Sequence, residues 1–282
     1  MKRKKKWILP VTAVILILLT VWIMWANTAL EVNEYEIMSD KIPEAFSGFR
    51  IAQVSDLHNK DFGEGYGKLL TLLSQINPDI IVVTGDLIDS RQTDLDVALE
   101  FAWQAGKIAR VYYVSGNHEA RVPEYENLKI GLIKAGVVIL ENQKVQITKE
   151  GESITLMGID DPSFQESYLF GGAEGVARQA ISDLQNESDG YTILLSHRPE
   201  LFDTYVDSGV DLVFSGHAHG GQFRLPFVGG LVAPNQGLFP EYDAGQFTRE
   251  NTTMLVSRGV GNSIVPIRFN NRPEIVVAQL EN

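Results

Sequence analysis

Apolar and polar positions alternate in two different periods from Phe49 onward. Five short apolar runs rich in β-branched residues have the length and composition of buried strands; they lie at residues 50–55, 79–85, 110–116, 192–196 and 211–216. Apolar side chains recur at helical spacing in the first two intervals, at Leu69, Leu70, Leu72, Leu73 and Ile76 and then at Leu95, Ala98, Phe101, Ala102 and Ala105. Strands that alternate with helices in this way predict an α/β protein built in layers.

A third helical pattern and two groups of closely spaced strands complete the predicted body. The helical pattern carries Leu128, Leu132 and Ile133 and starts at Pro123, where a missing backbone N–H breaks no helical hydrogen bond. Turn residues separate the strands of each group, as in antiparallel sheets; the groups are 137–140, 145–148 and 153–159, then 252–257, 264–269 and 274–280. We expect two sheets packed face to face with helices outside. Residues 220–250, rich in Gly and Pro, are expected to form a functional loop.

The segment before residue 27 is apolar on every side. Residues 7–26 carry no charge, and a helix of that length crosses roughly 30 Å of hydrocarbon. The basic tip at 1–6 is expected to stay cytoplasmic, which makes residues 7–26 a single-pass anchor and places the rest on the extracytoplasmic side of the cell membrane. A cleaved signal peptide and a buried core helix are the alternatives. The remainder divides into a tether with a first strand at 27–47 and the main domain at 48–282.

Composition excludes several classes of protein. An apolar content of 44% in 282 residues allows a hydrophobic core, so disorder is not expected. Residues 2–6 hold five of the 24 basic residues, which leaves 19 basic against 36 acidic residues and a formal charge of −17. A body this acidic repels nucleic acid, which we exclude as a partner. The absence of cysteine excludes disulfides, zinc–thiolate clusters and cysteine nucleophiles.

Candidate metal-binding side chains follow all five predicted strands. Asp56 and His58 follow the first in S-D-L-H, and Asp86 follows the second in G-D-L-I-D. The others follow in G-N-H-E, L-L-S-H and G-H-A-H; they are Asn117, His118, His197, His217 and His219. Strand carboxyl ends share one edge of an open α/β sheet, so we expect these side chains to converge. Extended backbone would turn residues two apart, such as Asp56 and His58, to the same side.

The chemistry of these side chains favours metal binding. Imidazole, carboxylate and amide oxygen without thiolate suit Mn, Fe or Zn ions. The ligands are too numerous for one ion, so two divalent ions are expected. Each motif alone is more often a turn, a cap or a satisfied polar pair. Five such motifs at five strand ends leave little room for coincidence.

The ordered motifs resemble those of the calcineurin-like metallophosphoesterase superfamily over about residues 48–281. Residues 220–247 and 257–275 are also similar to a membrane-associated bacterial branch, the YkuE/YaeI-like phosphoesterases. The resemblance implies a two-sheet β-sandwich flanked by helices, and makes 48–282 a catalytic domain that hydrolyses a phosphoester or pyrophosphate bond. It also implies two ligand sets, Asp56, His58, Asp86 and His219 for one ion and Asp86, Asn117, His197 and His217 for the other.

In this resemblance Asp86 bridges the ions, and His118 lies near the leaving group without being a ligand. Two ions supply a bridging hydroxide near neutral pH and coordinate phosphoryl oxygens, which explains how an acidic protein binds phosphate. His118 would protonate the leaving oxygen, and Asn117 and His118 would both contact the substrate. Glu119 is either a partner that orients His118 or a carboxylate at a helix start.

Three interpretations of the function follow. The branch resemblance and the anchor favour a lipid-linked substrate, such as a UDP-diacylglucosamine type; the runner-up is a phosphomonoesterase or phosphodiesterase for soluble nucleotides or phosphoproteins. A non-catalytic membrane scaffold is third, because such scaffolds tend to have lost ligands. Arg198 and Arg258 are candidates for a second phosphate contact, with surface ion pairing as the alternative. Apolar loop residues either line an acyl-chain groove or pack on the body: Phe223, Leu225, Phe227, Leu231, Leu238 and Phe239.

Overall fold

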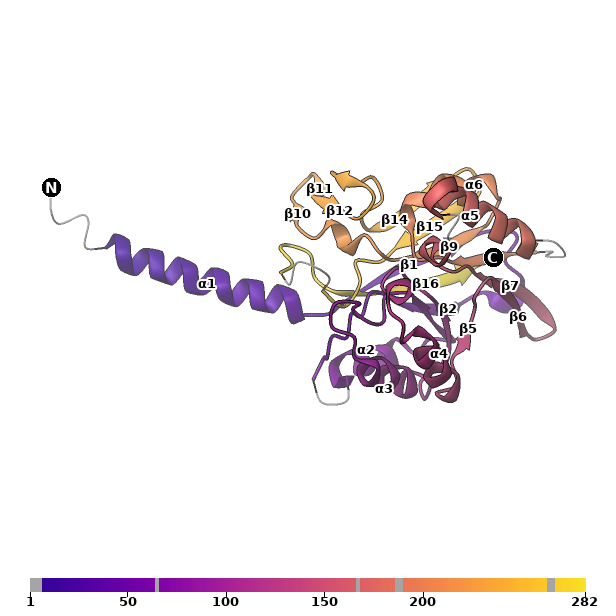
Figure 1. Ribbon diagram of the computed structural model, residues 1–282, viewed down its shortest axis with the longest axis horizontal. Helices are drawn as coiled ribbons and strands as arrows, with labels where there is room; N and C mark the ends of the chain where they lie inside the picture. Colours follow the sequence, from indigo (N-terminus) through magenta and orange to yellow (C-terminus); the bar gives the residue numbers. More distant parts are fainter. Residues whose placement is uncertain (1–6, 64–65, 166–167, 186–189, 263–266) are drawn as a thin grey trace.

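Two six-stranded sheets form the body of the protein (Figure 1). The computed structural model describes residues 7–63, 66–165, 168–185, 190–262 and 267–282, so the basic tip at 1–6 lies outside it. The first sheet has the order β1 (Glu31–Met38), β16 (Glu274–Glu281), β2 (Phe49–Val54), β3 (Ile80–Thr84), β4 (Arg110–Val114) and β5 (Val138–Ile139). The second has the order β14 (Gly245–Arg249), β15 (Thr252–Val256), β9 (Leu212–Ser215), β8 (Thr192–Leu195), β7 (Glu152–Gly158) and β6 (Gln143–Lys149).

Alternate side chains of each strand serve two different cores. In β3, Ile80 and Val82 lie in the core between the sheets, where they share one buried cluster with Ile193 and Phe214 of the second sheet. The intervening Ile81 and Val83 face the helices outside. This period of two, with both faces apolar, is why β3 reads as a continuous apolar run.

Helices cover the outer face of each sheet (Figure 1). α2 (Gly67–Ile76), α3 (Leu95–Ala105) and α4 (Tyr125–Lys134) bury Leu69, Phe101 and Leu128 against the first sheet. α5 (Tyr168–Gln185) and α6 (Phe202–Asp207) bury Ile181 and Tyr205 against the second. Short 3-10 turns connect these elements: η2 (Glu44–Phe46), η4 (Glu119–Arg121), η5 (Pro162–Phe164), η6 (Pro199–Leu201) and η7 (His219–Gly221). The predicted α/β fold with two packed sheets and outer helices is confirmed.

The five strands that carry the motifs are confirmed as β2, β3, β4, β8 and β9, and the first strand predicted within 27–47 is β1. The antiparallel interpretation of 137–140 is wrong, because β5 continues the first sheet parallel to β4. The groups at 145–159 and 252–280 are mixed: β6 and β7 are antiparallel, but β7 runs parallel to β8, β15 parallel to β9 and β16 parallel to β1. β7 and β8 are connected through helix α5, and the partners in the other two parallel pairs of these groups lie still farther apart in the chain, which local turn signals do not register.

Some boundaries also differ from the prediction. α4 begins at Tyr125, two residues beyond Pro123, and its Ile133 is exposed. The strand predicted at 264–269 lies partly outside the described residues, and its described end contributes only an isolated bridge between Phe269 and Phe223. Helix α5 and strand β14 have no counterpart in the predicted elements.

Within residues 220–250, where the sequence predicts a loop, residues 224–238 form two small hairpins and β14 joins the second sheet. The hairpins are β10 (Arg224–Leu225) with β11 (Gly229–Gly230), and β12 (Val232–Ala233) with β13 (Gly237–Leu238). The hairpins lie on the side of the body from which helix α1 (Ile8–Thr28) extends (Figure 1). Among the described residues, Leu9–Thr28 is the one helix long and apolar enough to cross a membrane, and only 6% of its apolar window is buried. The alternative of a buried core helix is therefore wrong.

Candidate metal centre

The loops after β2 and β3 lock together at the carboxyl edge of the first sheet. The Asp56 N–H donates to the Gly85 carbonyl at 3.1 Å, and the His58 N–H donates to the Asp86 carbonyl at 3.0 Å. Left-handed backbone at Asp56 (φ 54°), His58 (φ 47°) and Asp86 (φ 52°) turns the side chains inward. The expectation of extended backbone at these pairs is wrong, because each strand ends before its motif. Such conformations are costly for residues with a side chain and cluster at functional sites.

Two glycines in the motifs leave room for these carboxylates. A Cβ on Gly116 would lie 2.3 Å from Asp86 Oδ1, and one on Gly216 would lie 2.5 Å from Asp56 Oδ2. Both distances are shorter than non-bonded atoms tolerate, so glycine is required for the approach of neighbouring backbone to the two acids.

One group of side chains lies between β2, β3 and β9. His58 Nε2 and His219 Nε2 are 3.1 Å apart, Asp56 Oδ1 is 3.4 Å from His219 Nε2, and Asp86 Oδ2 is 3.6 Å from His58 Nε2. One ligand atom from each of these four buried residues lies within 4.8 Å of the others. The structure thus brings together the four residues of the first predicted ligand set.

A second group adjoins the first and shares Asp86 with it. Asp86 Oδ2 is 3.3 Å from His197 Nε2, which in turn is 3.1 Å from His217 Nδ1 and 3.3 Å from Asn117 Oδ1. The other ring nitrogen of His197, Nδ1, lies 2.7 Å from the Thr84 carbonyl oxygen, which orients the ring. The same oxygen of Asp86 therefore faces both groups, and the second predicted set is also assembled.

The protonation states of these groups fit cations at both positions. Burial lowers the pKa of His58 to about 4 and holds those of His217 and His219 well below their usual range, so the imidazoles are neutral, as metal ligands must be. Burial opposes ionisation of Asp86, but His197 holds the pKa of its carboxyl well below the usual range. Burial opposes protonation of His197, but Asp86 raises its pKa to about 10, so a proton on this ring offsets part of the buried negative charge, and a bound ion would take its place. Two divalent ions would supply the compensating positive charge with the donor atoms present.

His118 lies beside the first group with a different set of partners. Its ring is packed edge-on against that of His58, with 4.6 Å between centroids. Its Nδ1 accepts a hydrogen bond from the Ser90 backbone N–H at 3.0 Å and lies 3.7 Å from Asp89 Oδ1. Burial lowers the pKa of His118. Asp89 and Ser90 were missed as functional residues, although Asp89 is the second acid of G-D-L-I-D and offered a signal.

Glu119 is the first residue of η4, as the helix-start alternative predicted, and its carboxylate also binds backbone N–H groups of two loops. Its Oε2 accepts from the backbone N–H groups of Asp86 at 2.9 Å and Gly116 at 2.8 Å, and its Oε1 accepts from that of Ile88 at 3.2 Å. Burial raises its pKa to about 8. Glu119 thus joins the loops after β3 and β4 and shapes the backbone that presents Asp86, while His118 is oriented by Ser90.

The two candidate arginines are both engaged by carboxylates. Arg198 donates to both oxygens of Asp161, from Nε at 2.6 Å and Nη2 at 2.9 Å. Arg258 donates from Nη2 to Glu274 at 2.6 Å. The geometry supports ion pairing for both residues. Arg198 is buried, so its ion pair does not lie at the surface.

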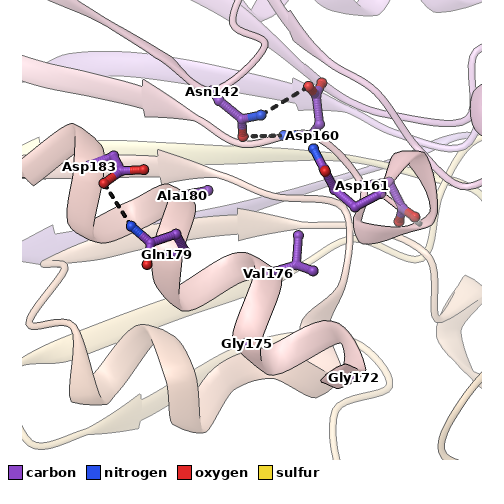
Figure 2. A pocket seen from close by; sticks show the side chains of 10 residues that line it. Asn142, Asp160, Asp161, Gly172, Gly175, Val176, Gln179, Ala180 and Asp183 are labelled. Carbon is purple, nitrogen blue, oxygen red and sulfur yellow. Dashed lines mark hydrogen bonds between the residues drawn. The ribbon is translucent and has the colours of Figure 1, made fainter. Parts of the chain in front are cut away.

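A cavity of about 440 Å³ lies beside Asp161, between the end of β7 and helix α5 (Figure 2). Among the residues that line the cavity, Asn142 donates a hydrogen bond to Asp160, and Gln179 donates one to Asp183 within α5. Three acidic side chains line the cavity, which makes it a poor site for a phosphoryl group.

The loop of the hairpins contributes one more side chain that sequence reasoning missed. Asn235, between β12 and β13, places its Nδ2 3.1 Å from Nε2 of His217 and donates to Glu200 at 2.9 Å. An isolated Asn in a Gly-rich stretch carries no signal of this contact. The hairpin segment therefore touches the metal centre directly.

Comparisons with known proteins agree with this geometry. The family model described as calcineurin-like phosphoesterase matches residues 49–221. The chain is 29% identical to the uncharacterized metallophosphoesterase YkuE of Bacillus subtilis, over 90% of this chain and 86% of that protein. It is 32% identical to an uncharacterized metallophosphoesterase of Campylobacter jejuni, over 94% of this chain and 68% of that protein.

Two further comparisons support narrower conclusions, because one covers little more than half of the relative and the other has low sequence identity. The chain is 29% identical to the Danio rerio transmembrane protein with metallophosphoesterase domain, over 87% of this chain but only 56% of that protein's length. The solved structure of TT1561 from Thermus thermophilus aligns with a TM-score of 0.51 at 14% identity, covering 76% of this chain and 91% of that one. The structural likeness concerns the fold alone.

Proposed function

Because the chain belongs to the calcineurin-like phosphoesterase family, we propose that it is a membrane-anchored enzyme that hydrolyses a phosphoester or pyrophosphate bond at a dinuclear metal centre. The chain is a metal-dependent phosphohydrolase by family. The observation that carries the dinuclear proposal is the shared position of Asp86, whose Oδ2 lies 3.6 Å from His58 Nε2 and 3.3 Å from His197 Nε2. A carboxylate oxygen that lies between the imidazoles of His58 and His197 is suited to bridge two ions.

The proposed ligands follow the two groups of side chains. Asp56, His58, Asp86 and His219 would hold one divalent ion, and Asp86, Asn117, His197 and His217 the other. Mn, Fe and Zn suit this donor set. Ions bound here would lower the pKa of a water and offset negative charge on the phosphoryl oxygens.

His118 is proposed to act on the leaving group. Because its Nδ1 accepts the Ser90 N–H, the neutral ring carries its proton on Nε2. That N–H can donate to the leaving oxygen as negative charge develops there. Asn117 would help to position the substrate from the second group. The ion pairs of Arg198 and Arg258 speak against a phosphate contact from either side chain.

Membrane attachment is proposed through α1, and relatives named as transmembrane proteins support it. The basic residues before Trp7 favour a cytoplasmic amino terminus and an extracytoplasmic body. In this division residues 7–26 are the anchor, 27–47 lead through β1 into the body, and 48–282 form the catalytic domain.

We propose a lipid-linked substrate, for which the surroundings of α1 provide support. A cavity of about 760 Å³ lies where α1 meets α2, lined in part by Trp25, Leu30, Phe62 and Leu72. An apolar cavity at the foot of a membrane helix suits an acyl chain. The second candidate is a soluble phosphodiester, favoured by the burial of the candidate ligands among other polar side chains.

One assay with the purified full chain in detergent tests these proposals. Hydrolysis of a phosphomonoester, a phosphodiester and a nucleotide-lipid diphosphate would be compared, with Asp86→Asn as the inactive control. We expect the lipid diphosphate to have the highest kcat/KM. Equal or higher kcat/KM for the soluble diester would favour the second candidate, and no hydrolysis of any of the three by metal-loaded protein would contradict the proposed activity.

A further inference from the structure

The two hairpins of residues 224–238 expose large apolar side chains. The side chain of Phe227, at the tip of the hairpin that β10 and β11 form, is fully exposed, and that of Val228 beside it is 58% exposed. Leu238 and Phe239 of the second hairpin are 70% and 61% exposed. Residues 225–240 carry no charge at all in a chain that is 21% charged. Several large apolar side chains exposed on one uncharged segment mark a contact with something apolar.

Helix α1 contacts the body before it has crossed the thickness of a bilayer. The ring of Trp22 packs edge-on against Phe269, with 4.8 Å between centroids. From Ile8 to Trp22 the helix rises only roughly 21 Å at 1.5 Å per residue, whereas the hydrocarbon core is about 30 Å thick. If α1 spans the bilayer, the part of the body that touches Trp22 lies at the depth of the lipid. A tilted helix would bring it deeper still.

The hairpins are joined to this contact by hydrogen bonds. The Arg224 N–H donates to the Phe269 carbonyl at 3.0 Å, and Phe223 forms a bridge with Phe269. On the other side, the Arg268 N–H donates to Asn27 Oδ1 at 2.9 Å, and Asn27 Nδ2 returns a bond to the Arg268 carbonyl at 3.2 Å. α1, residues 268–269 and strand β10 are therefore fixed to one another.

We propose that the tip of the first hairpin, at Phe227 and Val228, and the open end of the second, at Leu238 and Phe239, insert into the same lipid leaflet as the end of α1, forming a second membrane contact. The inference rests on the proposed function, because it requires α1 to span a membrane. Figure 1 shows the hairpins and α1 on the same side of the body, consistent with one bilayer surface meeting both.

Charges around the surface suit this position. Arg224, at the base of the first hairpin, is paired with Asp243 at 3.0 Å, and Glu241, two residues beyond Phe239, lies 3.7 Å from Arg249. Arg272 lies over the ring of Trp25 in α1, 4.8 Å from its centroid, an arrangement suited to the headgroup layer. Exposed apolar residues elsewhere on the body, such as Met38 and Trp103, lie on other elements, β1 and α3.

A consequence for the enzyme follows from Asn235. The second hairpin carries both the inserted Leu238 and the Asn235 contact with His217. The first hairpin begins five residues after His219, the other histidine of the same motif. Membrane contact would thus hold the metal-binding loop close to the lipid surface, where a membrane-borne phosphoryl group is presented.

Spin-label depth measurements test the insertion. Because the chain has no cysteine, Phe227→Cys provides a unique labelling site in the full chain. Leu18→Cys in α1 is the lipid reference, and Met38→Cys at the far end of β1 is an exposed apolar reference on the body. Labelled proteins would be placed in phosphatidylcholine and phosphatidylglycerol nanodiscs. Collision rates with oxygen, which enters lipid, and with a water-soluble nickel chelate would be compared.

We expect the ratio of oxygen to nickel collisions at 227 to approach that at 18 and to be several-fold higher than at 38. A ratio at 227 equal to that at 38, with a high ratio at 18, would overturn the insertion and leave the anchor intact. A low ratio at 18 would overturn both. Hydrolysis of a soluble phosphodiester by each labelled protein reports folding, and Val228→Cys replaces Phe227→Cys if that variant fails to fold.

Discussion

The backbone N–H of Ser90 donates a hydrogen bond to Nδ1 of His118 at 3.0 Å. Because a backbone N–H cannot rotate away as a side-chain donor can, this bond fixes both the orientation of the imidazole and the nitrogen that carries its proton. In the proposed mechanism this bond leaves the N–H of Nε2 free to donate toward the leaving group at neutral pH.

This relation predicts a difference between two substitutions of one residue. Ser90→Pro removes the N–H and should lower kcat by at least about tenfold, within the range of general acid catalysis. Ser90→Ala keeps the N–H and should change kcat by less than about threefold. Steady-state kinetics with equal metal content is the measurement. The Ser90 hydroxyl oxygen also lies 3.1 Å from His118 Nδ1, and equal loss of kcat in both variants would argue that this hydroxyl, and not the main chain, orients His118.

Loss of the carboxylate oxygen of Asp86 that is proposed to bridge the ions should disable the centre. Asp86→Asn is expected to reduce phosphoester hydrolysis by at least about a hundredfold and to lower the bound metal from two ions per chain. His118→Ala should cause a similar loss of activity with metal content unchanged. Metal analysis separates the two cases, and Asp40→Asn, at an exposed position, is the matched control. Wild-type turnover in Asp86→Asn would contradict the bridging role.

Metal removal should abolish activity reversibly. Chelator-treated full chain is expected to be inactive and to recover when Mn²⁺ is added, because the buried carboxylates and imidazoles then regain a cation. Hydrolysis of a soluble phosphodiester before and after addition is the measurement. Undiminished turnover in a sample free of metal would exclude a metal-dependent mechanism.

Stability should depend on pH through Asp160, which lines the cavity of Figure 2. Burial, together with nearby Glu141, raises its pKa from 3.8 to about 7. The folded state then holds a proton that the unfolded state has lost, so this group lowers the free energy of unfolding as pH rises from about 4 to about 7. Asp160→Asn should flatten that decline. Urea denaturation at pH 4.5 and 7.5 would measure it, and an identical slope in both proteins would refute the assignment.

Membrane insertion of the hairpins predicts a selective kinetic defect. Phe227→Asp combined with Val228→Asp should lower kcat/KM for a lipid-linked diphosphate in vesicles at least several-fold and leave hydrolysis of a soluble diester near that of wild type. The charged side chains resist transfer into lipid, while the metal centre is untouched. Trp103→Asp on α3 is the control for an exposed apolar residue elsewhere. Equal defects on both substrates would indicate damage to the fold.

The sequence alone determined the strands that carry the chemistry, because local periodicity and local composition are written in consecutive residues. Ile80 to Thr84 are apolar on both faces, as a strand buried between two layers must be. The motifs that follow the strands also placed all seven candidate ligands at one edge. The apolar span of α1 could be predicted for the same reason, since its length and composition are local properties.

Tertiary structure decided the pairings and partners that join distant residues. β16 lies between β1 and β2, parallel to one and antiparallel to the other, although no turn connects it to β1. Ser90 and Glu119 acquire their roles through main-chain N–H groups, which every residue but proline possesses and which therefore leave no mark in a sequence. The left-handed backbone at Asp56 and Asp86 arises where two loops lock together, so only the folded chain brings the two ligand groups to a single oxygen.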